Sequence, residues 1–343
     1  MSQPKDLAIC TVSFRSQDYL NLGWELTRQL NNTGKHSWEW IVVENTPEGD
    51  PERLAPGDER FRILSGIDMT NIKSKYPAGY QHAAGLNKAL SQVRSRYVLI
   101  LDPDFFVIRR NWISDLIEHM QRDHIVFLGS PYHPKWYMKI RYVPVAYCLL
   151  IDLEKANRSD LDFIVRYPPG EEGGGEIKKS LPESLRKTFR PASHLLSWLI
   201  FNRKLIESER DTGWHLYDKI KRAGTEDYCK YECLVPVFHP SRDLIGKAYL
   251  PQAFNGVIEK FLPDQRSYIP RKAGYFSQVG FKERGYADLN AREWEEYLWR
   301  GEPFGFHLRG YPKRGRDMRP DKEFLKDFLG RFANFKQENI GVS

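Results

Sequence analysis

Two aspartates separated by a single proline follow a short apolar segment, and they are the clearest chemical feature of the sequence. The segment Tyr97–Leu101 predicts a buried strand, and Asp102 and Asp104 come directly after it. Carboxylates this close repel each other unless a cation or a donor lies between them. Ligands of open α/β sheets bind at the carboxyl ends of strands. We therefore expect Mg²⁺ or Mn²⁺ here, with phosphates as further ligands. A strand-end turn whose acids cap the next element is the alternative.

Apolar and amphipathic segments alternate over the first 150 residues and would position these acids. The expected strands cover residues 7–14, 38–43, 61–64, 97–101 and 125–128, and the expected helices cover 19–30, 81–93 and 111–120. Alternation of this kind predicts an α/β fold with a mostly parallel central sheet flanked by helices.

The second half of the sequence is less regular. Residues 143–151 are apolar and are expected to return to the sheet, 168–176 form a glycine-rich loop, and 212–223 predict a helix. Residues 229–238 are typical of a final strand, and the tryptophan-rich chain from 286 is expected to be helical and then basic. We therefore divide the chain into a binding half at 1–135, an acceptor and catalytic half at 136–285, and a C-terminal extension at 286–343.

Composition narrows the class of protein. The 343 residues are 41% hydrophobic and carry a net charge of +7, which allows a sizeable core and an anionic partner or merely a basic surface. Cys10 and Cys148 lie in apolar segments, whereas Cys229 and Cys233 have no second pair at zinc-site spacing. The sequence has no apolar segment long enough for a signal peptide or a membrane span, so we expect a cytoplasmic protein.

Four segments in order resemble the family 2 glycosyltransferases, which have the GT-A fold. They are Thr11-Val12-Ser13-Phe14, Ile41-Val42-Val43-Glu44-Asn45, the small-residue helix at 79–90, and the strand with its Asp-x-Asp motif at 97–104. The resemblance covers roughly residues 6 to 130, and Glu44 stands where the family usually has an aspartate. It implies the GT-A fold, with a less regular acceptor side in the C-terminal half.

The resemblance also implies a role for each matching residue. Thr11 and Ser13 would lie beside the nucleotide, Glu44 would accept from its base, and Asn87 would hold the ribose or diphosphate. Asp102 would approach the ribose or a metal-bound water, and Asp104 would bind the metal directly. The alternatives are that Thr11 and Ser13 merely end a strand and that Asn87 is a helix-surface residue.

The sequence offers two candidates for the catalytic base and two histidines as further metal ligands. In the family the base is an acid in a short motif that opens a helix, which favours Asp211 over Asp227; Asp211 would otherwise be only an N-cap. His239 or His307 would complete the metal site, and an imidazole ligand favours Mn²⁺ slightly over Mg²⁺.

These features together predict a metal-dependent glycosyltransferase with a UDP- or GDP-sugar donor. The resemblance implies that transfer inverts the configuration of the sugar carbon. The acceptor would be a glycan or lipid-linked hydroxyl in surface polysaccharide or glycoconjugate synthesis, and no nucleic acid is expected as a partner. The basic residues 309–319 would close over the diphosphate or contact the inner face of a membrane. The alternatives are a sugar nucleotidyltransferase, whose glycine-rich loop is missing after the first strand, and a carbohydrate- or nucleic-acid-binding module.

Overall fold

The larger of two sheets forms the centre of the molecule. The computed structural model describes residues 4–70, 77–134, 139–140, 142–166, 210–223, 229–238, 275–308 and 319–332. The sheet has the strand order β3-β2-β1-β4-β7-β6-β8. Its strands are β1 (Leu7–Ser13), β2 (Trp38–Glu44), β3 (Arg62–Ser65), β4 (Tyr97–Leu101), β6 (Phe127–Gly129), β7 (Cys148–Asp152) and β8 (Tyr231–Cys233). Only β7 runs antiparallel to its neighbours, β4 and β6. The predicted α/β class with a mostly parallel sheet is confirmed.

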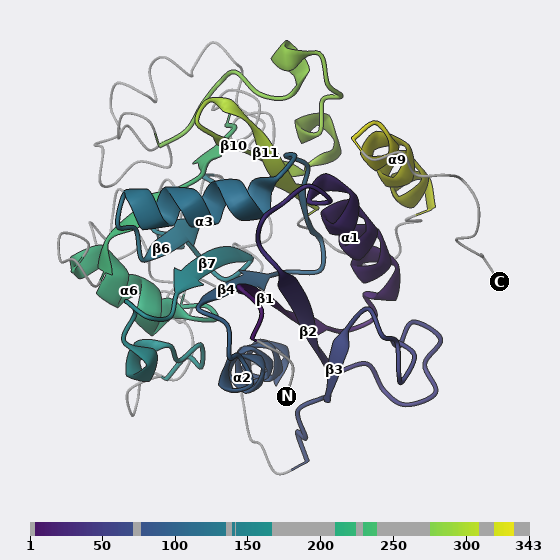
Figure 1. The fold of residues 1–343 in the computed structure, drawn as a ribbon. Helices are drawn as coiled ribbons and strands as arrows, with labels where there is room; N and C mark the ends of the chain where they lie inside the picture. Colours follow the sequence, from purple (N-terminus) through teal and green to yellow (C-terminus); the bar gives the residue numbers. More distant parts are fainter. Residues whose placement is uncertain are drawn as a thin grey trace, which may run out of the picture.

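Helices cover both faces of this sheet. Figure 1 shows α1 (Gln17–Leu30) and α3 (Trp112–Arg122) on one face and α2 (Pro77–Ser91) on the other. All residues of β1 and β4 are buried, which explains why these strands read as unbroken apolar segments rather than alternating ones. Small residues bring α2 close to β1: a Cβ added at Gly85 would lie 2.8 Å from Val12 Cγ2. The predicted core cysteines Cys10 and Cys148 are buried and free.

A second, antiparallel sheet joins distant parts of the chain in the order β5-β11-β10-β9. Its strands are β5 (Phe105–Val107), β9 (Val235–Pro236), β10 (Glu295–Trp299) and β11 (Glu302–His307). Each of the three predicted parts of the chain contributes at least one strand to it. The division at 135 and 285 therefore does not separate the sheets, and its functional meaning stays a prediction.

The hairpin of β10 and β11 corrects two expectations. The prediction of helix from residue 286 is wrong over 295–307, and residues 229–238 do not form the final strand. Arg300 and Gly301 have φ values of 53° and 78°, the left-handed geometry of a two-residue hairpin turn. Aromatic residues on either side of an Arg-Gly turn favour strands, and that signal outweighs the helical spacing.

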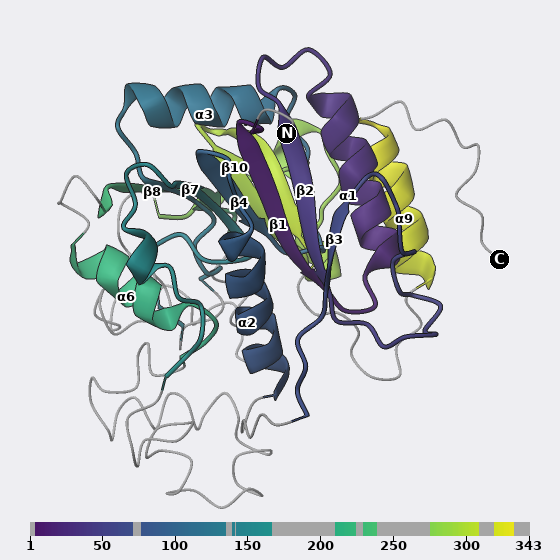
Figure 2. The ribbon, with the colours of Figure 1, turned by 60° about the horizontal axis from the view of Figure 1, so that its bottom comes forward.

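The described residues include five further helical elements. They are α6 (Trp214–Arg222), α9 (Arg319–Gly330) and the 3-10 helices η1 (Arg158–Asp160), η6 (Lys282–Arg284) and η7 (Asn290–Arg292). Helix α9 lies beside α1 in both ribbon views (Figure 2), and Lys322 Nζ of α9 donates to Asp18 Oδ2 of α1 at 2.7 Å. The predicted loop at 168–176 and residues 309–318 of the basic segment lie outside the described residues.

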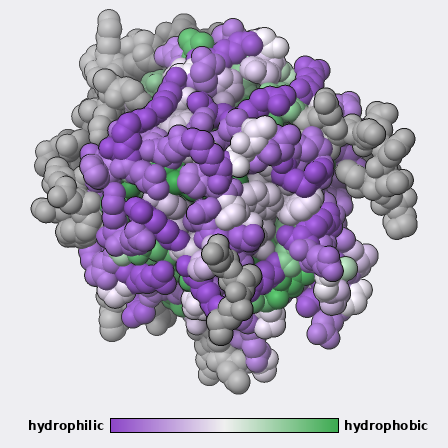
Figure 3. Space-filling view, viewed as in Figure 1, coloured by the Kyte–Doolittle hydropathy of each residue, from purple (hydrophilic) through white to green (hydrophobic). Residues whose placement is uncertain are grey.

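The face of the molecule drawn in Figure 3 is mainly hydrophilic where it is coloured, with hydrophobic residues in separate areas. Within the described ranges, no helix combines the length and the hydropathy needed to cross a bilayer.

Candidate metal site

The turn from β4 to β5 aims two carboxylates at the same place. The backbone N–H of Asp102 donates to Tyr147 O at 3.1 Å, which anchors the end of β4 to the start of β7. The N–H of Phe105 donates to Asp102 O at 3.0 Å, so the chain turns tightly around Pro103 before it enters the second sheet. Because proline fixes its own φ angle, the turn holds Asp102 and Asp104 in a narrow range of orientations.

The second sheet brings His307 to these aspartates. Strand β11 pairs with β5 in a register that sets His307 opposite Phe105, and Leu308 N–H donates to Asp104 O at 3.0 Å. The Nε2 atom of His307 lies 3.1 Å from Asp104 Oδ1 and 3.9 Å from Asp102 Oδ2. The sequence separation between His307 and Asp104 is 203 residues. The pairing of β11 with β5 therefore brings His307 to the two aspartates.

These three side chains fit a divalent cation. One ligand atom from each of Asp102, Asp104 and His307 lies within 4.8 Å of the others. Two carboxylates and one imidazole suit Mn²⁺ well, and Mg²⁺ less well because it prefers oxygen ligands. Of the predicted metal ligands, Asp102, Asp104 and His307 come together, while His239 lies outside the described residues.

The environment of His307 stabilises its charged form when no metal is bound. The side chain is 4% exposed, and burial alone would disfavour the imidazolium. The charge and hydrogen bond of Asp104, together with Glu295, outweigh this effect and raise the pKa of His307 to about 9. A cation would have to displace this proton in order to bind the imidazole.

His82 is a second histidine at the site, and the sequence analysis assigned it no role. It lies on α2, and its Nε2 atom is 3.4 Å from Asp102 Oδ1. Burial disfavours its charged form, but Asp102 and then the charges of Asp211 and Asp104 raise the pKa of His82.

Asp211 is fixed by two side chains from the chain between β6 and β7. Its Oδ2 atom accepts from Lys139 Nζ at 2.8 Å and from Tyr132 Oη at 3.1 Å. The N-cap of α6 is Gly213, with no side-chain cap, so Asp211 is not the N-cap of that helix. Its carboxylate is 37% exposed, whereas Lys139 is 10% exposed. Asp211 thus has solvent access and a largely buried lysine beside it, and its role as the base stays a prediction. The alternative candidate, Asp227, lies outside the described residues.

Glu44 and Ser13 are engaged within the protein. Glu44 is 1% exposed, and its carboxylate accepts from Ser13 Oγ and from the backbone N–H groups of Thr46 and Leu54 at 2.8–3.1 Å. Glu44 therefore holds the turn after β2 against β1. The predicted contact of Glu44 with a base stays a prediction.

Thr11 and Asn87 also have partners inside the protein. The Thr11 hydroxyl is fully buried, donates to Leu101 O at 2.8 Å and accepts from Trp40 Nε1 at 2.9 Å. Asn87 donates to Asp162 Oδ1 at 2.7 Å and accepts from the N–H of Phe163 at 3.0 Å. Thr11 thus fastens β1 to β4, and Asn87 fastens α2 to the segment after η1. Their predicted contacts with a nucleotide remain predictions.

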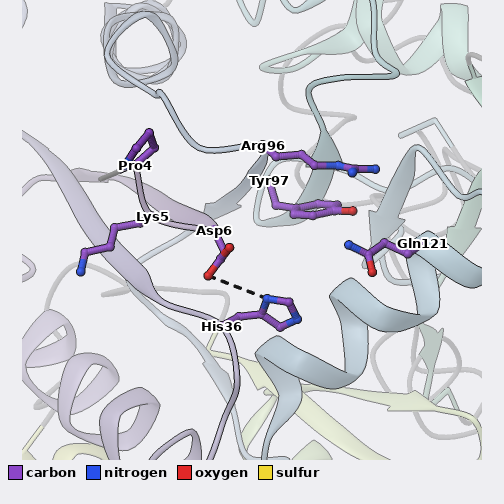
Figure 4. Close-up of a pocket in the computed structure, with 7 residues that line it drawn as sticks. All are labelled: Pro4, Lys5, Asp6, His36, Arg96, Tyr97 and Gln121. Atoms are coloured by element: carbon purple, nitrogen blue, oxygen red, sulfur yellow. Dashed lines mark ion pairs between the residues drawn. The ribbon is translucent and has the colours of Figure 1, made fainter. Parts of the chain in front are cut away.

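A hollow of about 510 Å³ lies at the opposite, amino ends of β1 and β4 (Figure 4). Its acidic and guanidinium groups already have partners in the protein. Asp6 accepts from the N–H and hydroxyl of Ser37, and the Arg96 guanidinium binds Asp152 at 2.9 Å and Glu154 at 3.0 Å. The carboxyl end of β4 is therefore the better candidate for a functional site.

Sequence reasoning missed most of the residues that support the site. His82 lay within a segment that the resemblance had singled out, so its place on the helix before the metal motif was the available signal. Lys139 and Tyr132 belong to a segment without any motif. Glu295 follows Trp294 in the chain predicted as helical, and only the Arg-Gly turn after it could have shown that it lies on a strand.

The family comparison agrees with this location. Residues 75–161 match the model of the Glycosyl transferase family 2, and this stretch contains α2, β4 and the two aspartates. The match confirms the resemblance predicted from the sequence and supports a glycosyltransferase. No curated protein sequence matches the chain.

Solved structures with some similarity include two glycosyltransferases. The mannosyltransferase PcManGT from Pyrobaculum calidifontis, in complex with GDP-Man and Mn²⁺, is 11% identical with a TM-score of 0.31, over 45% of this chain and 46% of that one. S. aureus TarS 1–349 is 12% identical with a TM-score of 0.30, over 87% of this chain and 98% of that one. The match thus spans less than half of the mannosyltransferase.

Proposed function

We propose that this protein is a metal-dependent glycosyltransferase that transfers a sugar from a nucleoside-diphosphate sugar to an acceptor hydroxyl. One observation carries the proposal. Asp102 and Asp104, within the segment that matches the family model, meet His307 at the carboxyl end of a buried strand. Ligand sites of open α/β sheets lie at such strand ends.

Asp102, Asp104 and His307 would hold the cation, with Mn²⁺ favoured by the imidazole. A divalent ion bound there would neutralise the negative charge that gathers on the diphosphate leaving group. His82 adds a positive charge beside Asp102 when protonated, which would also attract the diphosphate.

The nucleoside would lie at the ends of β1 and β2. Hydrogen bonds hold this edge together: Thr11 donates to Leu101 O, and Glu44 accepts from Ser13 Oγ and from the N–H of Thr46. Phe14 follows Ser13 and is 52% exposed, which offers a ring face for stacking with a base. UDP- and GDP-sugars are the candidate donors, and Asn87 is a candidate contact to the ribose or diphosphate.

Asp211 is our candidate for the general base. The acceptor hydroxyl would give its proton to an oxygen of the Asp211 carboxylate while the hydroxyl oxygen attacks the sugar carbon from the face opposite the diphosphate. This direct displacement inverts the configuration of that carbon. Lys139 and Tyr132 hold the carboxylate through Oδ2, which limits its rotation. Positioned base catalysis of this kind is worth about 10²–10⁴-fold.

The acceptor we propose is a glycan or a lipid-linked sugar in surface polysaccharide or glycoconjugate synthesis. The basic residues between 309 and 319 would bind the donor diphosphate or an anionic membrane surface. A lipid-linked acceptor and a basic segment both suit a cytoplasmic protein that contacts the inner face of the membrane, and we propose this location.

Thermal unfolding with UDP or GDP, each with and without Mn²⁺, tests the proposal. We expect one nucleotide to raise the melting temperature only when Mn²⁺ is present, because Asp102 and Asp104 would hold the ion and its charge would attract the diphosphate. Asp104→Asn should abolish the increase, and Asp115→Asn, on the outer part of α3, should preserve it. A melting temperature that no nucleotide changes, with or without the ion, would contradict the proposal.

A further inference from the structure

We propose that Glu295 is a positioning residue that orients His307 for metal binding. The inference rests on the proposed function, because it concerns the same metal site. Glu295 lies on β10, directly behind His307 as seen from the two aspartates.

The strand register places Glu295 and His307 on the same face of the second sheet. Glu295 is paired with His307 in the antiparallel ladder of β10 and β11, and opposite residues of such a ladder point to the same side. The Oε2 atom of Glu295 lies 3.5 Å from His307 Nδ1, while His307 Nε2 lies 3.1 Å from Asp104 Oδ1. The imidazole therefore lies between a rear carboxylate and the front carboxylates of the site.

The burial of Glu295 indicates a specific purpose. Its side chain has no solvent exposure, and a buried carboxylate is costly unless it is paired and hydrogen-bonded. Tyr297 Oη donates to Glu295 Oε2 at 3.2 Å, and His307 is its neighbour of opposite charge. The hydrogen bond from Tyr297 and the contact with His307 offset this cost, and they hold the carboxylate against the imidazole.

The next residue provides a contrast. Glu296 is also buried, at 1% exposure, but alternation along the strand turns it to the other face. It accepts from the N–H groups of Phe281 at 2.8 Å and Leu289 at 3.2 Å, so it holds a loop. The two adjacent buried acids therefore differ in their contacts: Glu296 accepts from backbone N–H groups, whereas Glu295 lies against the imidazole of His307.

Tyr147 complements Glu295 by setting the plane of the imidazole. The two rings stack with centroids 4.7 Å apart and an interplanar angle of 22°. The hydroxyls of Tyr147 and Tyr297 are 3.0 Å apart, which links the stacked ring to the support of Glu295. Stacking fixes the ring plane but not which nitrogen faces the aspartates. The Glu295 carboxylate, 3.5 Å from Nδ1, favours a proton on that nitrogen and so leaves the Nε2 lone pair for the cation.

Binding of Mn²⁺ alone, followed by electron paramagnetic resonance, tests this inference. Loss of such a supporting carboxylate should weaken Mn²⁺ binding by about 10–100-fold in Glu295→Ala. Glu295→Gln keeps the shape and an acceptor oxygen, so we expect it to recover part of the affinity. Glu302→Gln, an exposed position on the same hairpin, is the matched control and should bind as the wild type does.

A second measurement separates orientation from structural support. Carboxylates suit both Mg²⁺ and Mn²⁺, and a correctly oriented imidazole adds to the preference for Mn²⁺. Glu295→Ala and Glu295→Gln should therefore reduce the ratio of Mn²⁺ to Mg²⁺ affinity, whereas a loss of stability alone would weaken both ions equally. Thermal unfolding establishes that each variant is folded.

The outcomes distinguish the two proposals. If Asp104→Asn loses Mn²⁺ binding while folded Glu295→Ala and Glu295→Gln keep wild-type affinity and ion preference, the role of Glu295 is wrong and the metal site stands. If the wild type binds no Mn²⁺, the metal site fails and the role of Glu295 fails with it.

Discussion

The two strands that supply the candidate metal ligands differ in how they are built. Strand β4 is buried within the mostly parallel sheet, and Asp102 and Asp104 follow it directly in the sequence. Strand β11 belongs to an antiparallel hairpin, and its histidine reaches the site only through pairing with β5. The position of the two aspartates thus depends on a local sequence motif, whereas the position of His307 depends on the pairing register of β11 and β5. Substitutions in the two regions should accordingly differ in what they damage.

The largest effect is expected at the local motif. Asp104→Asn should lower sugar transfer by about 10³-fold, since the charge stabilisation from a bound ion is worth several kcal/mol. The fold should survive, because Asn is nearly the same size as Asp. Transfer rates over a range of Mn²⁺ concentrations measure this effect, with Asp115→Asn as control. Full activity of Asp104→Asn would show that the site lies elsewhere.

The charge of His307 should make the metal-free protein sensitive to pH. Folding raises the pKa of His307 from an ordinary 6.5 to about 9, so its contribution is complete below pH 6.5 and is lost as the pH rises through 9. The difference amounts to about 3 kcal/mol. Denaturant unfolding of the wild type and His307→Gln in a chelator should show free energies that converge at high pH. A constant gap between the two curves across this range would contradict the assignment.

Substitution of one glycine in each sheet compares how much close strand packing contributes to the stability of the two sheets. A Cβ at Gly129 of β6 would lie 2.0 Å from Cys148 O, and a Cβ at Gly305 of β11 would lie 2.6 Å from Phe106 O. We expect Gly129→Ala and Gly305→Ala each to destabilise the fold by about 1–3 kcal/mol, with Gly129→Ala the more severe. Chemical denaturation measures both.

The glycine of the second sheet should also affect the metal site. Displacement of β11 from β5 would separate His307 from Asp104, so folded Gly305→Ala should bind Mn²⁺ more weakly than the wild type. Wild-type Mn²⁺ affinity in folded Gly305→Ala would mean that the register of β11 does not determine the site.

The smallest effect is expected at the hairpin turn. Gly301 has a φ of 78°, and a side chain there costs about 1 kcal/mol. Gly301→Ala should lower the melting temperature by a few degrees, while Glu302→Ala next to it should leave it unchanged. A Gly301→Ala protein as stable as the wild type would argue against the two-residue turn.

Much of the first sheet could be predicted because its signals are local. The unbroken apolar segments of β1 and β4, the helices between them and the Asp-x-Asp motif lie within short stretches of sequence. The hairpin at 295–307 was not predicted, because its pairing with β5 and β9 joins segments far apart in the chain and only the Arg-Gly turn marks it locally. The partners of Asp211 were also out of reach, because Lys139 and Tyr132 lie more than 70 positions from it and belong to no motif.

The sequence by itself determined that two carboxylates stand at the end of a buried strand, because a strand and the turn after it depend on neighbouring residues. The tertiary structure alone decided that His307 faces them, that Glu295 lies behind it and that Lys139 holds Asp211. Each of those contacts depends on pairing or packing between segments far apart in the chain, and the free energy that selects such a register comes from the whole core rather than from any local pattern.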